Sequence, residues 1–242
     1  MRRTILPRAF LAASISLCTT MSSAVVITPT DFDTLALGAA ITGPVGPEVE
    51  ASLVTAADES LGDISSRVQC PSGFGVCAPP TNPAGTTYTY IHEIIPGVDL
   101  TNDAPFAMPG TLLSPSGLTQ FSLAFPPSGF NGVAGFSFGQ ANTALAGGAS
   151  AITINAMADG IIWDLDATEG WDTGENLTFF WQTLQSPSGP GGQYQLANAA
   201  LSGIGAGPVP TTPVQVPEPT TGALLIGALL VMTASRRSRR RR

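Results

Sequence analysis

The chain has 242 residues, of which 43% are hydrophobic and only 11% are charged, and it contains no lysine. Between Val25 and Val216, sixteen acidic residues accompany a single arginine, Arg67. A surface so poor in cations cannot neutralise phosphates, which excludes nucleic-acid binding. The hydrophobic fraction excludes a disordered acidic chain. Composition therefore predicts an acidic, Gly/Pro-rich globular domain between two basic ends.

The first 24 residues have the layout of a secretory signal peptide. Three arginines near the start precede an apolar stretch over residues 9–17, and small residues over 22–24 form a cleavage site before Val25. We therefore expect residues 1–24 to enter the membrane as a short signal helix and to be removed on export. Cys18 lies in this segment and is expected to be removed with it.

Alternation of apolar and polar residues with a period of two dominates residues 25–202 and predicts one all-β domain. Over residues 87–95 the alternation places Tyr88, Tyr90 and Ile94 on one face, and β-branched or aromatic residues dominate. Further strands are predicted over residues 118–125, 133–138, 151–157, 161–165, 177–183 and 194–201.

Clusters of Gly, Pro, Asn and Asp separate these strands and supply the turns. Residues 51–67 keep no single period and are predicted to be a turn followed by a strand, whereas the small residues over 141–150 predict a loop. Short strands with turns at this spacing are typical of an antiparallel β-sandwich, in which each strand buries one face. The predicted fold is a lectin-like, jelly-roll or Ig-like sandwich, flanked by the N-terminal signal helix and a C-terminal transmembrane helix.

Cys70 and Cys77 are the cysteines that remain after removal of the signal peptide. An isolated pair in an oxidising compartment most often forms a disulfide. A zinc site would need four ligands, to which only His92 could add a nitrogen. We therefore predict a disulfide between Cys70 and Cys77.

His92 is the only histidine of the chain, so any Ser-His-Asp or Cys-His arrangement would have to use it. It shares a predicted strand face with Tyr88 and Tyr90. A packed strand residue is a plainer interpretation of such a histidine than a catalytic base.

An acidic cluster with two tryptophans, Trp163 and Trp171, spans residues 159–175 and is the candidate binding site. Carboxylates on adjoining loops suit Ca²⁺, although Glu169 stands where an EF-hand loop requires glycine. Two alternatives stay open: the acids form hairpin turns and a solvated face, or two of them act as a glycosidase pair with a tryptophan stacking on sugar. Apart from Ca²⁺, the sequence indicates no cofactor. The candidate Ca²⁺ ligands are Asp164, Asp166, Glu169, Asp172 and Glu175.

The chain from residue 203 changes first to glycine and then to proline, and residues 203–215 predict an extended stalk. A short motif follows over residues 216–219, and no charged residue occurs from Pro219 to Ser235. Residues 220–235 predict a transmembrane helix near the lower limit for crossing about 30 Å of hydrocarbon. The arginines that end the chain would stay in the cytoplasm. The motif consists of Val216, Pro217, Glu218 and Pro219.

The motif, the short apolar segment and the basic tail over residues 216–242 resemble, in that order, the PEP-CTERM sorting signal of Gram-negative bacteria that make exopolysaccharide. The resemblance implies that an exosortase, a membrane protease-transpeptidase, recognises the Pro-Glu-Pro segment and processes the protein at the inner membrane. The same C-terminal module occurs in proteins catalogued as ice-binding. An ordinary membrane anchor behind a proline-rich stalk is the alternative.

The order of elements within the domain is also similar to that of lectin-like sandwich domains in other PEP-CTERM exports. A turn and strand near residues 61–62 come first, the Thr-Tyr-Thr-Tyr strand over 87–90 follows, and the closing strand leads into Gly-Pro-Val-Pro over 207–210. We therefore expect an exported, non-enzymatic protein of the cell envelope or extracellular matrix, associated with exopolysaccharide. The competing hypotheses are a carbohydrate-active hydrolase using the 159–175 acids and an ice-surface binder, for which only Thr87 and Thr89 hint at a threonine array.

Overall fold

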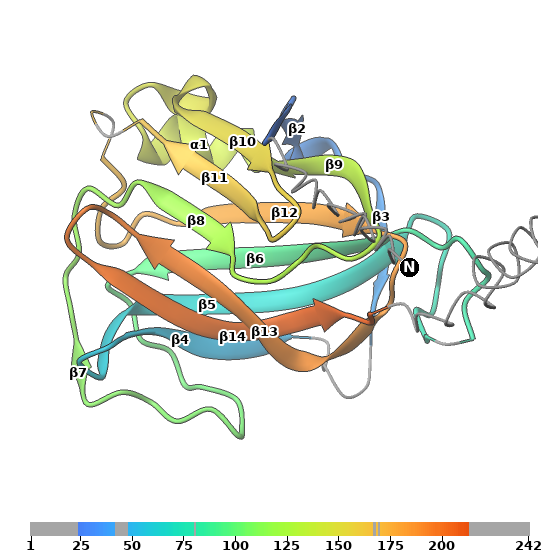
Figure 1. Ribbon diagram of the computed structural model, residues 1–242, viewed down its shortest axis with the longest axis horizontal. Coiled ribbons are helices and arrows are strands. Elements are labelled where there is room, and N and C mark those ends of the chain that lie inside the picture. Colours follow the sequence, from blue (N-terminus) through green and yellow to red (C-terminus); the bar gives the residue numbers. More distant parts are fainter. Residues whose placement is uncertain (1–23, 42–47, 80, 167, 169, 213–242) are drawn as a thin grey trace, which may run out of the picture.

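The computed structural model describes residues 24–41, 48–79, 81–166, 168 and 170–212 (Figure 1). The predicted signal peptide, apart from Ala24, and the sorting signal over 216–242 lie outside the described residues, as does the predicted transmembrane segment over 220–235. Within the described ranges, no helix is long and apolar enough to cross a membrane.

The fold is mostly β, as the alternation predicts. The first half contains β1 (Val25–Ile27), β2 (Thr30–Asp31), the 3₁₀ helix η1 (Phe32–Thr34), β3 (Leu37–Ala40), β4 (Val49–Thr55), β5 (Glu59–Pro71), β6 (Tyr88–Pro96) and β7 (Thr111–Leu112). The second half contains β8 (Gln120–Leu123), β9 (Phe130–Phe136), α1 (Phe138–Ala144), η2 (Gly148–Ala151), β10 (Ile152–Ala156), β11 (Ile161–Leu165), β12 (Leu177–Thr183), β13 (Pro187–Ala197) and β14 (Ser202–Pro210).

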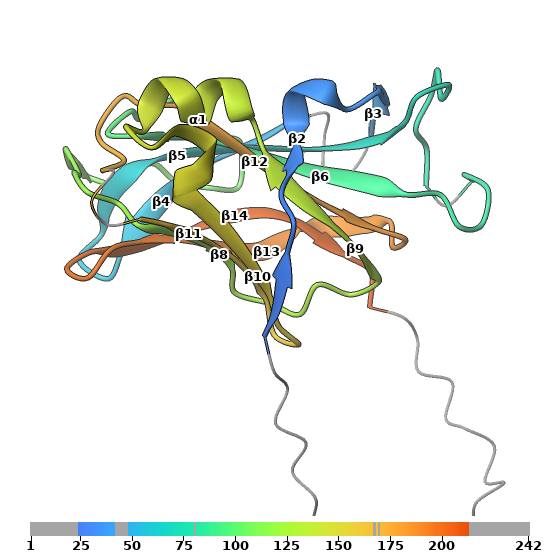
Figure 2. The ribbon, with the colours of Figure 1, turned by 90° about the horizontal axis from the view of Figure 1, so that it is seen from above.

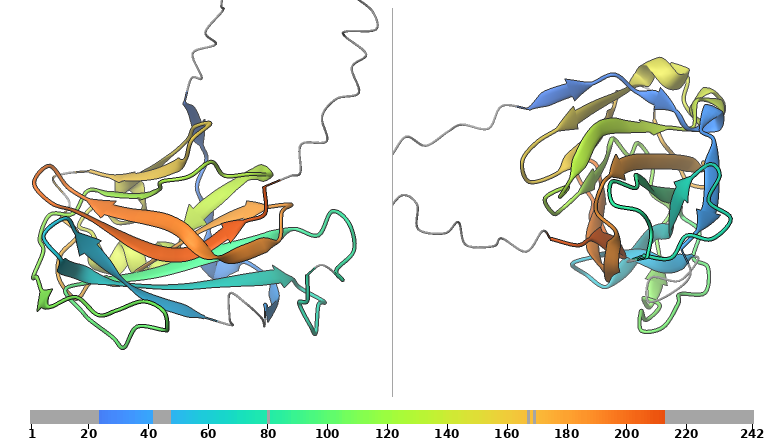
Figure 3. Two further views of the ribbon diagram at one scale, coloured as in Figure 1. Left: turned by 60° about the horizontal axis from the view of Figure 1, so that its bottom comes forward. Right: turned by 90° about the vertical axis from the view of Figure 1, so that its right-hand side faces the viewer.

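The strands form one curled sheet in the order β1-β10-β11-β8-β13-β14-β4-β5-β6-β12-β9-β2, while β3 and β7 pair with β5 (Figures 1 and 3). The long ladders are antiparallel, but β2 pairs with β9 and β7 with β5 in parallel. The described sheet is therefore mixed rather than purely antiparallel. The parallel pairings arise because two very short strands, separated from their partners by long connections, dock onto the antiparallel framework.

The core lies where β6 and β12 face β8 and β13 across the curl. The His92 and Tyr194 rings have centroids 4.1 Å apart, and those of Phe121 and Phe179 are 4.8 Å apart. These side chains are fully buried, as is Trp163. Each large aromatic side chain removes a wide apolar surface from water, and its truncation to alanine typically costs about 3–5 kcal/mol.

The expected stalk over residues 203–215 is wrong in its first part, because residues 202–210 form β14 in the middle of the sheet. Ile204 pairs with Val54 of β4, and β14 pairs along its length with β13. The glycines of this segment alternate with larger residues and serve close packing rather than flexibility. A Cβ on Gly203 would lie 2.7 Å from the Leu53 carbonyl oxygen, and one on Gly205 would lie 2.7 Å from Ile64 Cγ2.

The turn and strand predicted over residues 51–67 are confirmed only from residue 56, because residues 51–55 belong to β4. Asp58 turns the chain with φ 62°, and β5 begins at Glu59. The loop predicted over 141–150 instead contains the end of α1 and most of η2. Ser137 caps α1 by accepting a hydrogen bond from the Gln140 backbone N–H. Figure 2 shows α1 beside the N-terminal segment that carries η1.

Candidate functional site

Asp164 and Asp166, the first two candidate Ca²⁺ ligands, are held by separate neighbours. The Asp164 carboxylate on β11 accepts hydrogen bonds from the side-chain amides of Gln120 and Asn155, each at 3.1 Å. Asp166 accepts from the backbone and hydroxyl of Thr168, at 3.0 and 2.8 Å, and these bonds lower the pKa of its carboxyl. Each carboxylate therefore has a local structural task.

Asp172 and Glu175 form the turn that follows. Asp172 accepts a hydrogen bond from the Gly117 backbone N–H at 2.7 Å, and its own N–H donates to Glu175 at 2.6 Å. Glu169 lies outside the described residues. In the part of the chain that the structure describes, no three or more His, Cys, Asp or Glu side chains form a group that could hold a metal ion. The turn interpretation accounts for the contacts of the four described members, and the five-residue Ca²⁺ site that includes Glu169 stays a prediction.

The tryptophans between these acids are unable to stack on a sugar. Trp163 and Trp171 are both fully buried, and their indole N–H groups donate to the carbonyls of Gly135 (3.0 Å) and Glu175 (2.7 Å). The glycosidase hypothesis for residues 159–175 is therefore wrong in one part, the stacking of Trp163 or Trp171 on a sugar.

His92 is a core residue. A 2.9 Å hydrogen bond joins its Nδ1 to Ser66 Oγ, both residues are fully buried, and Nε2 has no partner among the described residues. Burial, assisted by the positive charge of Arg67, lowers the pKa of His92 to about 3. A neutral imidazole without solvent access matches the packed interpretation from the sequence.

Cys70 and Cys77 are joined in a disulfide with a Cα–Cα distance of 5.7 Å. Both are buried, and the Asn82 side-chain amide donates to the Cys70 sulfur at 3.3 Å. The bridge links the end of β5 to a chain segment that pairs with Ile41. This site is structural.

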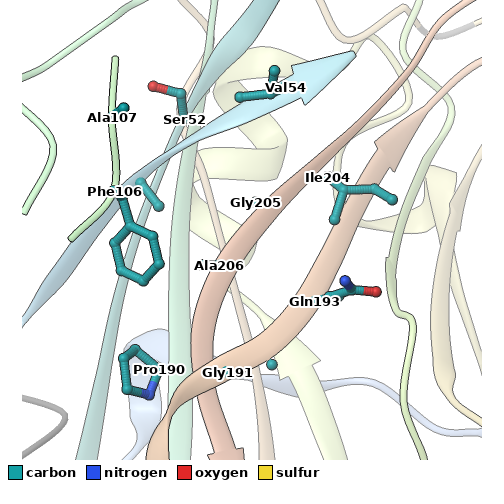
Figure 4. Close-up of a pocket in the computed structure, with 12 residues that line it drawn as sticks. Ser52, Val54, Phe106, Ala107, Pro190, Gly191, Gln193, Ile204, Gly205 and Ala206 are labelled. Carbon is teal, nitrogen blue, oxygen red and sulfur yellow. The ribbon is translucent and has the colours of Figure 1, made fainter. Parts of the chain in front are cut away.

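An uncharged groove lies on the outer side of β4, β14 and β13, with a volume of about 360 Å³. Its floor consists of small or apolar residues, Phe106 stands at one wall, and Gln193 and Ser52 supply polar groups (Figure 4). None of its described lining residues carries a charge. The lining is Ala51, Ser52, Val54, Phe106, Ala107, Pro190, Gly191, Gly192, Gln193, Ile204, Gly205 and Ala206.

A hydrogen-bond network on β4 positions the wall of this groove. The Ser52 hydroxyl contacts Asp99 Oδ1 at 3.2 Å and the Asn102 side chain at 2.9–3.1 Å. The Asn102 amide donates to the Ala107 carbonyl at 2.9 Å, next to Phe106. The segment that follows β6 is thereby fixed over the sheet rather than left as a free loop.

Sequence reasoning missed this groove because its residues come from four separate segments of the chain. The floor depends on β14, whose composition predicts a stalk, and the wall depends on a segment without alternation. An available signal was the period-two spacing of Gly203, Gly205 and Gly207, which indicates a strand packed closely on its core face.

Comparison with protein-family models, with curated proteins and with solved structures finds no match to this chain.

Proposed function

We propose that the protein is an exported, non-enzymatic component of the cell envelope or extracellular matrix, sorted by a PEP-CTERM-like C-terminal signal and associated with exopolysaccharide. The observation that carries the proposal is the order of three features at one end of the sequence. Pro217-Glu218-Pro219 is followed by an uncharged segment to Ser235 and then by six arginines in the last seven residues. Before processing, this end would anchor the chain in the inner membrane.

The finer fold that we propose is a lectin-like sandwich. The facing of β6 and β12 against β8 and β13 supports it, because two sheet faces then share one aromatic core. The Cys70–Cys77 disulfide supports an oxidising destination.

We assign polysaccharide binding to the groove on β4, β14 and β13. A floor of glycine and alanine lets a flat sugar ring approach the backbone, and Phe106 offers an apolar face for its C–H groups. The Gln193 amide and the Ser52 hydroxyl can exchange hydrogen bonds with sugar hydroxyls. The groove is shallow and open, which suits a chain that passes through rather than a small molecule that must be enclosed.

Support for a non-enzymatic role comes from His92, which is buried and hydrogen-bonded to Ser66. It also comes from Asp164 and Asp172, whose carboxylates accept hydrogen bonds on β11 and in a turn. Ice binding gains no support from Thr87 and Thr89, because Thr89 is only 2% exposed. The observations favour the matrix role over both alternatives.

Fractionation of producing cells tests the sorting proposal. We expect the wild-type chain in the envelope or matrix fraction, and a chain with Pro217→Ala, Glu218→Ala and Pro219→Ala retained in the inner membrane. A chain with Thr220→Ala and Thr221→Ala is the matched control, because it alters adjacent residues and keeps the motif. Identical fractionation of the wild-type and triply substituted chains, with and without exosortase activity, would favour the ordinary membrane anchor.

A further inference from the structure

A second hollow, of about 140 Å³, lies on the outer face of β4, β5 and β6 and is lined by carboxylates. The pairing register aligns Glu50 with Ser65 and Ser65 with Glu93, so that the three form a row across the sheet. Asp63 lies two residues before Ser65 on the same face of β5. The lining is Glu48, Glu50, Asp63, Ser65, Glu93, Ile95 and Leu100.

Two carboxylate oxygens in this hollow accept no hydrogen bond within the described residues. Asp63 is only 1% exposed, and its Oδ1 has no hydrogen-bond partner within the described ranges. The same holds for Glu50 Oε2, which is also buried from solvent. The remaining carboxylates are engaged, since Glu48 accepts from Ser65 and Glu93 accepts from Asn176. A buried anionic oxygen without a donor is costly unless a positive charge reaches it.

No cationic side chain lines the hollow among the described residues. Arg67, the only arginine in the described ranges, is on the same face of β5 but beyond Ser65 and outside the lining. Burial raises the pKa of the Asp63 and Glu50 carboxyls. The negative charges of Asp99 beside Asp63 and of Asp103 beside Glu50, on the segment after β6, raise it further. The local field therefore favours a cation from solution.

We propose that this hollow binds a hard divalent cation, Ca²⁺ in particular, through Glu50 Oε2 and Asp63 Oδ1, with Ser65 and water completing the oxygen shell. The hollow has room for an ion with several waters. Two carboxylates, rather than the three or more of a tight site, fit the weak affinity of extracellular calcium modules, with dissociation constants of about 10⁻⁴–10⁻³ M. The site is separate from the 159–175 acids.

The bound ion would also fix the wall of the groove. Asp63 Oδ2 accepts a hydrogen bond from the Leu100 backbone N–H. The Glu50 backbone makes two hydrogen bonds with Asp103: its N–H donates to Asp103 Oδ2 at 3.1 Å, and its carbonyl oxygen accepts from the Asp103 N–H at 3.0 Å. The segment that these bonds hold leads directly to Phe106. A bound cation would offset the repulsion of Asp63 by Asp99 and of Glu50 by Asp103, and would thereby strengthen the attachment of this segment to β4 and β5.

Thermal unfolding of the full chain in mild detergent, at pH 7.5 and constant ionic strength, tests the proposal. We expect 10 mM Ca²⁺ to raise the melting midpoint of the wild-type protein by several degrees, because the ion binds the folded state alone. Titration calorimetry should give one site per chain. The double variant Glu50→Gln, Asp63→Asn should melt at or above the wild-type midpoint without Ca²⁺ and should lose the Ca²⁺ response.

The matched control is Asp164→Asn, Asp166→Asn, which removes two carboxylates from the other acidic region and should keep the full response. A wild-type protein that Ca²⁺ does not stabilise would overturn the proposal, as would a Ca²⁺ response retained by the Glu50→Gln, Asp63→Asn variant. If that variant fails to fold, Glu50→Gln alone serves, and an unchanged calorimetric affinity would contradict the site. If acid pH stabilises the protein and Ca²⁺ has no effect, the carboxylates of the hollow are neutralised by protonation and the proposal is wrong.

Discussion

Two buried titratable residues act on stability in opposite directions. The pKa of His92 falls from 6.5 to about 3 on burial, so the unfolded chain binds a proton more readily than the folded one between these values. The pKa of Asp63 rises from 3.8 to about 6, chiefly through burial, so here the folded chain holds the proton more readily. The His92 contribution is complete above pH 6.5 and is lost as pH falls, whereas the Asp63 contribution is complete below pH 3.8 and is lost as pH rises to 6.

Substitution of Asp63 should separate these effects. In the absence of divalent cations, Asp63→Asn should be more stable than wild type at pH 7, by about 2 kcal/mol, because it removes an ionised and incompletely paired carboxylate. The difference should shrink as pH falls from 6 towards 4. Urea unfolding of both chains across this range measures it, and a constant difference at all pH values would mean that Asp63 does not titrate as described.

At the scale of elements, the strands marked by large apolar residues two apart are the ones that sequence predicts well. Residues 161–165 and 177–183 form β11 and β12 with the expected limits, and 87–95 forms all but the last residue of β6. Both faces of such segments are determined locally, by residues that lie two apart in sequence. The disulfide was equally accessible, because no other cysteine remained for Cys70 and Cys77.

The elements that sequence missed depend on distant partners. β14 has the composition of a linker. It forms a strand because its backbone pairs with β13 and β4, and because its glycines fit closely against Leu53 and Ile64. β13 begins at Pro187, seven residues earlier than predicted. Shifts in its register with β14 accommodate the glycines and prolines in this part of the strand. The groove uses β13, β14, β4 and the segment after β6, and the spaced glycines of β14 are its only local signal. The acidic hollow uses β4, β5, β6 and the same segment, and it depends on the pairing of strands that are separate in sequence.

A glycine substitution in β14 distinguishes a packed strand from a stalk. Gly205→Ala would bring its Cβ within 2.7 Å of Ile64 Cγ2 and 3.1 Å of Leu53 Cδ2, which should destabilise the fold by about 1–3 kcal/mol. Gly110→Ala is the control, because nothing lies within 4 Å of its Cβ position and its φ is not positive. Thermal unfolding measures both. Equal midpoints for the two variants would mean that β14 is not packed in the sheet.

At the scale of the whole molecule, the negative charge of the domain limits which polysaccharides can bind in the groove. The domain between the two basic ends carries sixteen acidic residues and one arginine, while the described lining of the groove is uncharged. Polyuronates and sulfated polymers are repelled by such a surface at low salt. We therefore expect a neutral polysaccharide as the partner.

Co-sedimentation with insoluble polysaccharide checks this expectation. The wild-type chain should sediment with a neutral glucan and leave a polyuronate gel unbound in Ca²⁺-free buffer. Phe106→Ala should lower the bound fraction severalfold, because the wall of the groove loses its apolar face. Met108→Ala, which changes an exposed residue of the same segment outside the groove, should bind as wild type does. Equal losses in both variants would place binding elsewhere.

The intact mass of the protein recovered from the envelope and matrix of producing cells tests the export and processing claim most directly. The account predicts a chain that begins at Val25, contains the Cys70–Cys77 disulfide and lacks the arginine tail beyond Ser235. A full-length mass that begins at Met1 and ends at Arg242, found in the soluble interior of the cell, would contradict it.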